Sequence, residues 1–210
     1  MVDIVFWIVL FLATVILHEV CHGFAACRLG DPTARDAGRL TFNPLKHVDL
    51  YWTVLFPAML FIATQGRFAI GMAKPVPVNF LRLRNPRRDM VIVALAGPLA
   101  NFILAGALNF FWKLFQNDYF LYGIYFNLGI ALFNLVPIPP LDGSRVLAGI
   151  LPVSLSRAYL KIEPFGFLIV LGLYMSGALL YIIIPGMNFF CRLLEVPTLL
   201  EFLYRAQSAA

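Results

Sequence analysis

The fold follows from one stretch of sequence, Leu17-His18-Glu19-Val20-Cys21-His22-Gly23, which lies at the end of a long apolar run. On a helix, His18 and His22 lie one turn apart on the same face, so the two imidazoles can bind one metal ion. Glu19 lies about 100° round the helix from His18, given 3.6 residues per turn. It is therefore beside the metal rather than on it, as a general base that acts on water requires. The stretch predicts half of a catalytic metal site.

The composition is typical of an integral membrane protein. Of the 210 residues, 61% are hydrophobic and 13% are charged, whereas a soluble domain is about 45–50% apolar and about 25% charged. Soluble zinc proteases with the same motif are therefore disfavoured. The net charge of +5 comes from basic residues between apolar segments, which indicates cytoplasmic loops rather than nucleic-acid binding. The three cysteines stand at unrelated spacings, so no disulfide framework is predicted.

Apolar segments recur along the chain. The first helix is predicted from Val2 to about Cys27; a cleaved signal peptide is the alternative, but Asp3 and the absence of Lys or Arg before the apolar run argue against it. Further apolar segments cover residues 50–64, 90–115, 119–136, 165–185 and 187–205. The last of these fits either an interfacial helix or a short final span. We therefore predict an all-α polytopic membrane protein with about four to six transmembrane helices, forming one membrane-embedded domain over residues 1–210.

Residues 50–79 are predicted to form a re-entrant hairpin, because basic loops flank them on both sides and place both ends in the cytoplasm. The returning arm reads Lys74-Pro75-Val76-Pro77-Val78-Asn79. Alternating prolines remove the N–H donors from one edge of an extended chain and keep them on the other. This pattern favours a short β-strand that pairs with an extended peptide, and a proline-rich connector without a partner is the alternative.

Two histidines need a third protein ligand, and Asp142 is the best candidate. Most other acidic residues lie in loops or at segment ends, whereas Asp142 follows a long apolar, proline-rich run that should bring it to the depth of His18 and His22. A carboxylate at that depth is costly unless it is paired or binds a cation. The alternative role of Asp142 is a helix cap for the residues from Gly143 onward.

Other ligands and another metal stay open at this point. His47 is the one other histidine, and Cys21 flanks the histidine pair as a soft ligand. Two histidines and a carboxylate describe catalytic zinc, and they also describe a non-haem iron site. Glu19 favours hydrolysis, because an oxygenase needs no such base.

Three motifs occur together in this chain. They are His18-Glu19-Val20-Cys21-His22, Gly97-Pro98-Leu99-Ala100-Asn101, and the segment from Asn134 to Leu141-Asp142-Gly143. Together they resemble the site-2 protease family of intramembrane zinc metalloproteases. The resemblance covers roughly the first 150 residues and implies a catalytic core of about 1–150, followed by C-terminal helices at about 164–205. We expect a minimal form without a PDZ or CBS domain.

The resemblance implies a role for each matching residue. The ligands of one zinc ion per chain would be His18, His22 and Asp142. Glu19 would be the catalytic base, and Asn134 would lie near the metal and help to hold the substrate backbone or the developing oxyanion. The segment Lys74–Asn79 would be the strand that pairs with the substrate.

The implied activity is hydrolysis of peptide bonds within or near the transmembrane segments of membrane-anchored proteins. The partners would be a membrane-protein substrate with a transmembrane helix and the lipid bilayer, without nucleic acid, and a homo-oligomer is compatible with the sequence. The protein would be a multi-pass protein of the cell membrane, with its active site within the bilayer near the cytoplasmic side.

Two other functions fit part of the pattern. A non-proteolytic metal-binding or scaffold protein of the same fold would have no use for Glu19. A membrane non-haem iron enzyme, such as a di-iron desaturase, needs many more histidines than the three in this chain.

Overall fold

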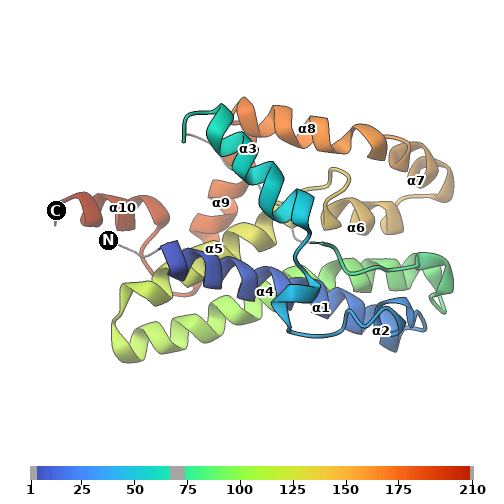
Figure 1. Ribbon diagram of the computed structural model, residues 1–210, viewed down its shortest axis with the longest axis horizontal. Helices are drawn as coiled ribbons and strands as arrows, with labels where there is room; N and C mark the ends of the chain where they lie inside the picture. Colours follow the sequence, from blue (N-terminus) through green and yellow to red (C-terminus); the bar gives the residue numbers. More distant parts are fainter. Residues whose placement is uncertain (1–3, 67–73, 209–210) are drawn as a thin grey trace. The chain divides into compact units, whose positions relative to one another are not determined.

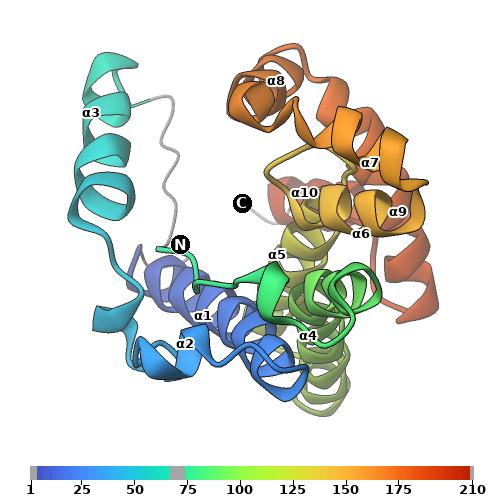
Figure 2. The same cartoon turned by 90° about the vertical axis from the view of Figure 1, so that its right-hand side faces the viewer.

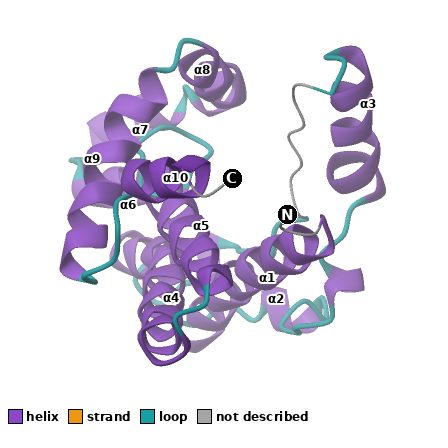
Figure 3. Cartoon of the chain, turned by 90° about the vertical axis from the view of Figure 1, so that its left-hand side faces the viewer, coloured by secondary structure: helices purple, strands orange, loops and turns teal. Residues whose placement is uncertain are grey.

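The computed structural model describes residues 4–66 and 74–208 (Figure 1). These residues form helices and loops, and none of them is in a strand (Figure 3). The chain divides into two units, Met1–Asp89 and Met90–Ala210.

The first unit is built on α1 (Ile4–Arg28), an apolar helix of 25 residues. It ends in a Schellman motif, in which the Asp31 N–H donates to the Ala26 carbonyl at 2.9 Å. Gly30 supplies the positive φ of 114° that this ending requires. A Cβ at Gly30 would lie 3.3 Å from the Arg82 carbonyl oxygen, so there is little room for a side chain. The cap fixes where the chain leaves the helix.

Short helical segments follow α1. They are α2 (Thr33–Asp36), η1 (Pro44–Lys46), the π-helical turn η2 (Leu50–Leu55), α3 (Phe56–Ala63) and η3 (Phe80–Arg82). The helix α2 packs on α1, and η2 continues directly into α3 (Figure 2).

The second unit begins within α4 (Pro86–Phe115), the longest helix among the described residues. The remaining helices are α5 (Asp118–Asn134), α6 (Asp142–Ile150), α7 (Val153–Leu160), α8 (Glu163–Met175), α9 (Ala178–Leu193) and α10 (Leu199–Ser208). Their core consists of apolar side chains from α4, α5, α9, α10 and the loop before α10: Ala105, Leu121, Ile124, Tyr125, Leu128, Met187, Cys191, Val196 and Phe202. The helices α5 and α9 pack against each other through this cluster.

A buried pair of amides joins α4 to α5. The Asn101 Nδ2 donates to Asn127 Oδ1 at 3.2 Å, and the Asn127 Nδ2 donates to the Gly123 carbonyl at 2.9 Å. Both asparagines are fully buried. Polar groups between apolar helices are stable only when they are paired in this way, so the pair fixes how α4 and α5 meet.

The prediction of four to six transmembrane helices is wrong. Among the described residues, two helices are long and apolar enough to span a membrane, α1 and α4, and a third results if α7 and α8, bent by 66° at their junction (Figure 2), count as one. The segment 165–185 was predicted as one span, but Gly177 with its positive φ of 74° separates α8 from α9. The helix α5 has 17 residues and α9 has 16, which is short of the roughly 20 that a span requires.

The prediction of a β-strand in the hairpin is also wrong. Residues 74–79 have no regular secondary structure, and their backbone groups bond to side chains and a loop instead of to a neighbouring strand. The outgoing arm of the expected hairpin is helical, because it contains η2 and α3. The turn at 67–73 lies outside the described residues.

Candidate metal centre

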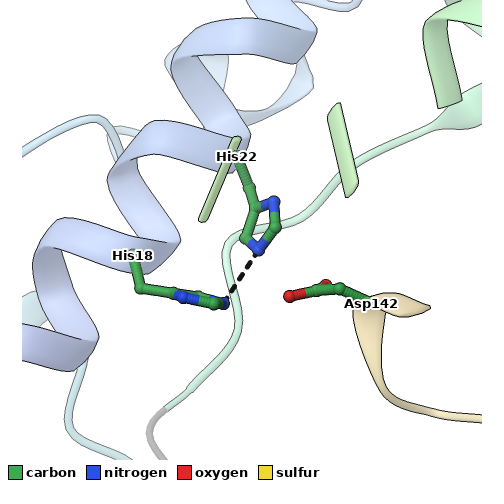
Figure 4. Close-up of side chains that lie close together, drawn as sticks. All are labelled: His18, His22 and Asp142. Atoms are coloured by element: carbon green, nitrogen blue, oxygen red, sulfur yellow. Dashed lines mark hydrogen bonds between the residues drawn. The ribbon is translucent and has the colours of Figure 1, made fainter. Parts of the chain in front are cut away.

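The helix α1 brings two imidazoles together in the first unit. His18 and His22 are both buried, and their Nε2 atoms lie 3.0 Å apart (Figure 4). Two ligands of a tetrahedral zinc ion, each about 2.0–2.1 Å from the metal, lie about 3.3 Å apart. The rings meet edge to face, with their centroids 4.6 Å apart. The pair therefore fits two of the ligands of one zinc ion with little movement.

Glu19 lies beside this pair and is held by the backbone. Its Oε2 accepts a hydrogen bond of 2.7 Å from the Val76 N–H. Gly23 makes this approach possible, since a Cβ there would lie 2.6 Å from the Val76 Cγ1 atom. The carboxylate is thus fixed on the flank of α1, off the metal-binding face, where the sequence predicts a base.

The segment Lys74–Asn79 is held to the first unit at several points. The Lys74 N–H donates to the His47 carbonyl at 2.8 Å, and the Arg39 guanidinium donates to the Lys74 carbonyl at 2.8 Å. The Asn79 N–H donates to Asp31 Oδ2 at 2.6 Å. Val76, in the middle of the segment, is buried. The segment is therefore fixed against α1 by hydrogen bonds to side chains and loop carbonyls.

Asp31 is an anchor that the sequence analysis did not identify. Its carboxylate is fully buried and accepts hydrogen bonds from the Thr33 N–H at 3.1 Å, the Thr33 hydroxyl and the Asn79 N–H. Burial by itself raises the pKa of Asp31, but these hydrogen bonds and the Arg82 charge outweigh burial and hold the pKa below its ordinary value. The available signal was an aspartate placed between a helix-ending glycine and Pro-Thr.

His47 and Cys21 were the other ligand candidates. The His47 Nε2 donates to the Thr41 carbonyl, with 2.8 Å between nitrogen and oxygen. That nitrogen is therefore used in holding the loop between α2 and η1. Cys21 is a half-buried free thiol on α1. Neither residue joins His18 and His22 in the set of side chains that could hold a metal.

In the second unit, Asp142 is the first residue of α6 (Figure 4). The N-cap is Leu141, so the alternative role of Asp142 as the cap is wrong. An acidic residue in the first turn is favoured by the helix dipole. A Cβ on Gly143 would collide with the carbonyls of Leu135 and Val136, so only glycine allows α6 to start this close to the end of α5.

The helices α7 and α8 contact the proline-rich loop that leads to Asp142. The Tyr159 hydroxyl donates to the Pro137 carbonyl at 2.7 Å. Gly166 lies directly against the Pro139 carbonyl and leaves no room for a Cβ. Arg145 on α6 forms an ion pair with Glu163 on α8. These contacts fix the start of α6 and hence the backbone of Asp142.

Asn134 is the last residue of α5. Its Nδ2 donates to the Ile130 carbonyl one turn earlier, at 3.0 Å. One N–H of the amide is used within the helix, and the second N–H of the same nitrogen points elsewhere. Asn134 and Asp142 thus stand at the two ends of one glycine- and proline-constrained loop of the second unit.

Comparison with known proteins identifies the family. The model of peptidase family M50 matches residues 6–121. The chain belongs to peptidase family M50. YwhC of Bacillus subtilis, named as a candidate zinc metalloprotease, is 35% identical over 187 residues, which cover 82% of this chain and 81% of YwhC. Rip2 of Mycolicibacterium smegmatis, named likewise, is 35% identical over 176 residues, which cover 80% of this chain and 66% of Rip2. No solved structure matches this M50 chain.

Membership of family M50 confirms the resemblance to the site-2 proteases. The matched region contains the histidine pair on α1 and the buried Asn101 on α4. The apolar helices α1 and α4 and the family together identify a membrane protein of the intramembrane zinc metalloprotease class.

Proposed function

We propose that this M50 protein cuts peptide bonds within or near the transmembrane segments of membrane-anchored proteins. The observation that carries the proposal is the pair of Nε2 atoms of His18 and His22, 3.0 Å apart on an apolar helix with Glu19 next in sequence. A structural site has no need of a carboxylate beside its histidines, whereas hydrolysis needs a base there. The names of YwhC and Rip2 as candidate zinc metalloproteases support the same chemistry.

The ligands we propose for one zinc ion per chain are His18, His22 and Asp142. Each side chain offers one ligand atom, two imidazole nitrogens and one carboxylate oxygen. This donor set is typical of catalytic zinc and keeps a fourth position open. A bound zinc ion supplies Lewis-acid chemistry, since it lowers the pKa of water to about 7 and polarises a carbonyl.

Glu19 transfers the proton in the proposed reaction. Its carboxylate takes a proton from the attacking water and delivers it to the leaving amine. The Val76 N–H occupies Oε2, so Oε1 accepts the proton. Asn134 holds the substrate carbonyl oxygen through the second N–H of its amide.

The segment Lys74–Asn79 holds the unwound substrate. A helical substrate hides its scissile carbonyl in its own hydrogen bonds and must open before water can attack. The N–H of Val76 is already used by Glu19, whereas the backbone of Val78 makes no hydrogen bond among the residues that the structure describes. Val78 is therefore the backbone position we propose for contact with the substrate.

We propose that the protein crosses the cell membrane more than once, with its active site within the bilayer near the cytoplasmic side. Its partners are the lipid bilayer and a substrate with a transmembrane helix. Support comes from exposed basic residues after the segment, of which Arg82 and Arg84 lie before α4 and Arg87 and Arg88 lie in its first turn. Clustered arginines at the end of a span favour the cytoplasmic side.

Replacement of the base tests the reaction. Purified Glu19→Gln, reconstituted in liposomes with a model transmembrane substrate, should stay folded and zinc-loaded but lose cleavage by at least about a hundredfold. The matched control is Glu195→Gln, because that carboxylate is exposed and pairs only with Lys113 among described residues. Undiminished cleavage by Glu19→Gln would disprove the role of this glutamate. A wild-type protein that binds zinc but never cuts would favour the scaffold function.

Elemental analysis tests the third ligand and the metal. Asp142→Ala should lose most of its bound zinc, whereas Asp118→Ala, in the first turn of α5, should keep one zinc per chain. A full equivalent of zinc in Asp142→Ala would exclude this carboxylate as a ligand. Iron instead of zinc in the wild type would overturn the assignment of the metal.

A further inference from the structure

Two buried charged side chains hold the two ends of the segment Lys74–Asn79. Arg39 reaches the first end, where its Nη2 lies 2.8 Å from the Lys74 carbonyl oxygen and 3.4 Å from that of Pro75. Asp31 reaches the last end through the Asn79 N–H at 2.6 Å. Glu19 binds the middle through the Val76 N–H. The segment is therefore held at both ends and bonded to the catalytic base between them.

We propose that Arg39 and Asp31 are positioning residues of the protease, which set the segment so that the Val76 N–H orients Glu19 and Val78 meets the substrate. The proposal rests on the proposed function, because it assigns the segment to substrate binding. Neither Arg39 nor Asp31 touches the reacting atoms in the proposed reaction. Both residues act through the backbone of the segment.

The burial of Arg39 supports this role. The residue is only 8% exposed, and a buried guanidinium is costly unless its N–H groups find acceptors. The Nη2 of Arg39 finds its acceptors in carbonyls of the segment, 35 and 36 residues away in sequence, whereas its buried Nε has no acceptor among the described residues. The neighbouring Arg35 is different, since it is exposed and pairs with the adjacent Asp36. Arg35 on α2 therefore forms a surface ion pair, whereas Arg39, in the loop after α2, binds the backbone of the segment.

Asp31 is oriented by its own local structure. The Schellman cap at Gly30 turns the chain so that the carboxylate points inward, and Thr33 occupies Oδ1 with its N–H and its hydroxyl. Oδ2 is left for the Asn79 N–H. A carboxylate that accepts several backbone N–H groups is a strong and directional acceptor. The end of α1 and the end of the segment are thereby fixed to one side chain.

The variants Arg39→Gln and Asp31→Asn test the proposal, with Arg35→Gln and Asp36→Asn as matched controls. In liposomes with the model substrate, each test variant should lose about tenfold in kcat/KM, while the controls stay within about twofold. The inactive Glu19→Gln protein leaves the substrate uncut, and its affinity for the substrate should weaken by a similar factor when Arg39→Gln is added. Zinc content should stay at one per chain, because neither residue is a proposed ligand. Arg39→Lys, which keeps the charge and one donor, should recover part of the loss.

A second measurement does not depend on cleavage. In a full-length protein with Cys21, Cys27 and Cys191 replaced by alanine, Val78→Cys is labelled with a soluble thiol reagent. Labelling should become about tenfold faster when Arg39→Gln is added, because the segment then detaches, and should not change with Arg35→Gln. Where Arg39→Gln does not fold, Asp31→Asn replaces it, because that change weakens the bond at the other end of the segment.

The outcomes separate the two proposals. If the wild type does not cut but labelling still depends on Arg39, the proposed function fails and the placement of the segment by Arg39 stands. If the wild type cuts and the folded Arg39→Gln protein keeps its kcat/KM, its substrate affinity and its labelling rate, the positioning role is overturned.

Discussion

Gly23 offers a direct test of how closely the segment must approach α1. A Cβ at this position would lie 2.6 Å from the Leu40 Cδ2 and Val76 Cγ1 atoms and 3.0 Å from the Ala34 Cβ. Ordinary carbon contacts begin near 3.5 Å, so Gly23→Ala forces Val76 to move by about 0.9 Å. A backbone shift of that size would lengthen the 2.7 Å hydrogen bond from the Val76 N–H to Glu19 Oε2 to about 3.6 Å, which is too long for a hydrogen bond.

The energetic cost of Gly23→Ala has two opposing parts. Overpacking of this kind costs about 1–3 kcal/mol, while the higher helix propensity of alanine returns about 1 kcal/mol. We therefore expect the free energy of unfolding in detergent to fall by up to about 2 kcal/mol. Cleavage should fall by about tenfold, since the base loses its backbone donor.

Two comparisons make this prediction specific. Gly106→Ala on α4 is the control, because a Cβ there meets nothing within 4 Å, and it should be neutral or slightly stabilising with full activity. Adding Val76→Ala to Gly23→Ala removes the Cγ1 contact and should recover part of the stability. Gly23→Ala with wild-type melting temperature and wild-type cleavage would refute the reasoning.

Three further predictions concern other parts of the molecule. Hydrogen bonds outweigh burial and hold the pKa of Asp31 below its ordinary value of 3.8. The ionised carboxylate therefore contributes its full stabilisation above pH 3.8, and this contribution is lost as the pH falls through the pKa of the folded state. The melting temperature of Asp31→Asn should therefore fall less steeply at acidic pH than that of the wild type. Asn127→Leu removes the 3.2 Å hydrogen bond between the buried amides of Asn101 and Asn127 and should cost about 1–2 kcal/mol of unfolding free energy, most of which the double leucine variant recovers in a double-mutant cycle. Tyr159→Phe removes the 2.7 Å bond to the Pro137 carbonyl and should cost about 1 kcal/mol in denaturant unfolding together with a partial loss of cleavage.

The helix that bears the histidine pair was predictable because its signals are local. A helix was predicted from the spacing of His18 and His22 and from the apolar run before them. The predicted end near Cys27 agrees with the observed end of α1 at Arg28. The long apolar segment 90–115 likewise gave α4. The break at Gly177 was missed, since one glycine between two apolar stretches does not show in composition.

The environment of the segment Lys74–Asn79 could not be predicted from local patterns. Its alternating prolines suggested an edge strand, but its hydrogen-bond partners are side chains far away in sequence. Glu19 is 57 residues from Val76, and Asp31 is 48 residues from Asn79. A single sequence gives no sign that a catalytic base and a turn aspartate share one backbone segment.

The alternating prolines then gain a meaning that a paired strand would not give them. If the segment shifted by one residue in either direction, Pro75 or Pro77 would stand opposite Glu19, and proline has no N–H to donate. A shifted segment would leave that carboxylate without its backbone donor. The prolines on either side of Val76 therefore act as a register lock, which lets a segment without a neighbouring strand keep one alignment.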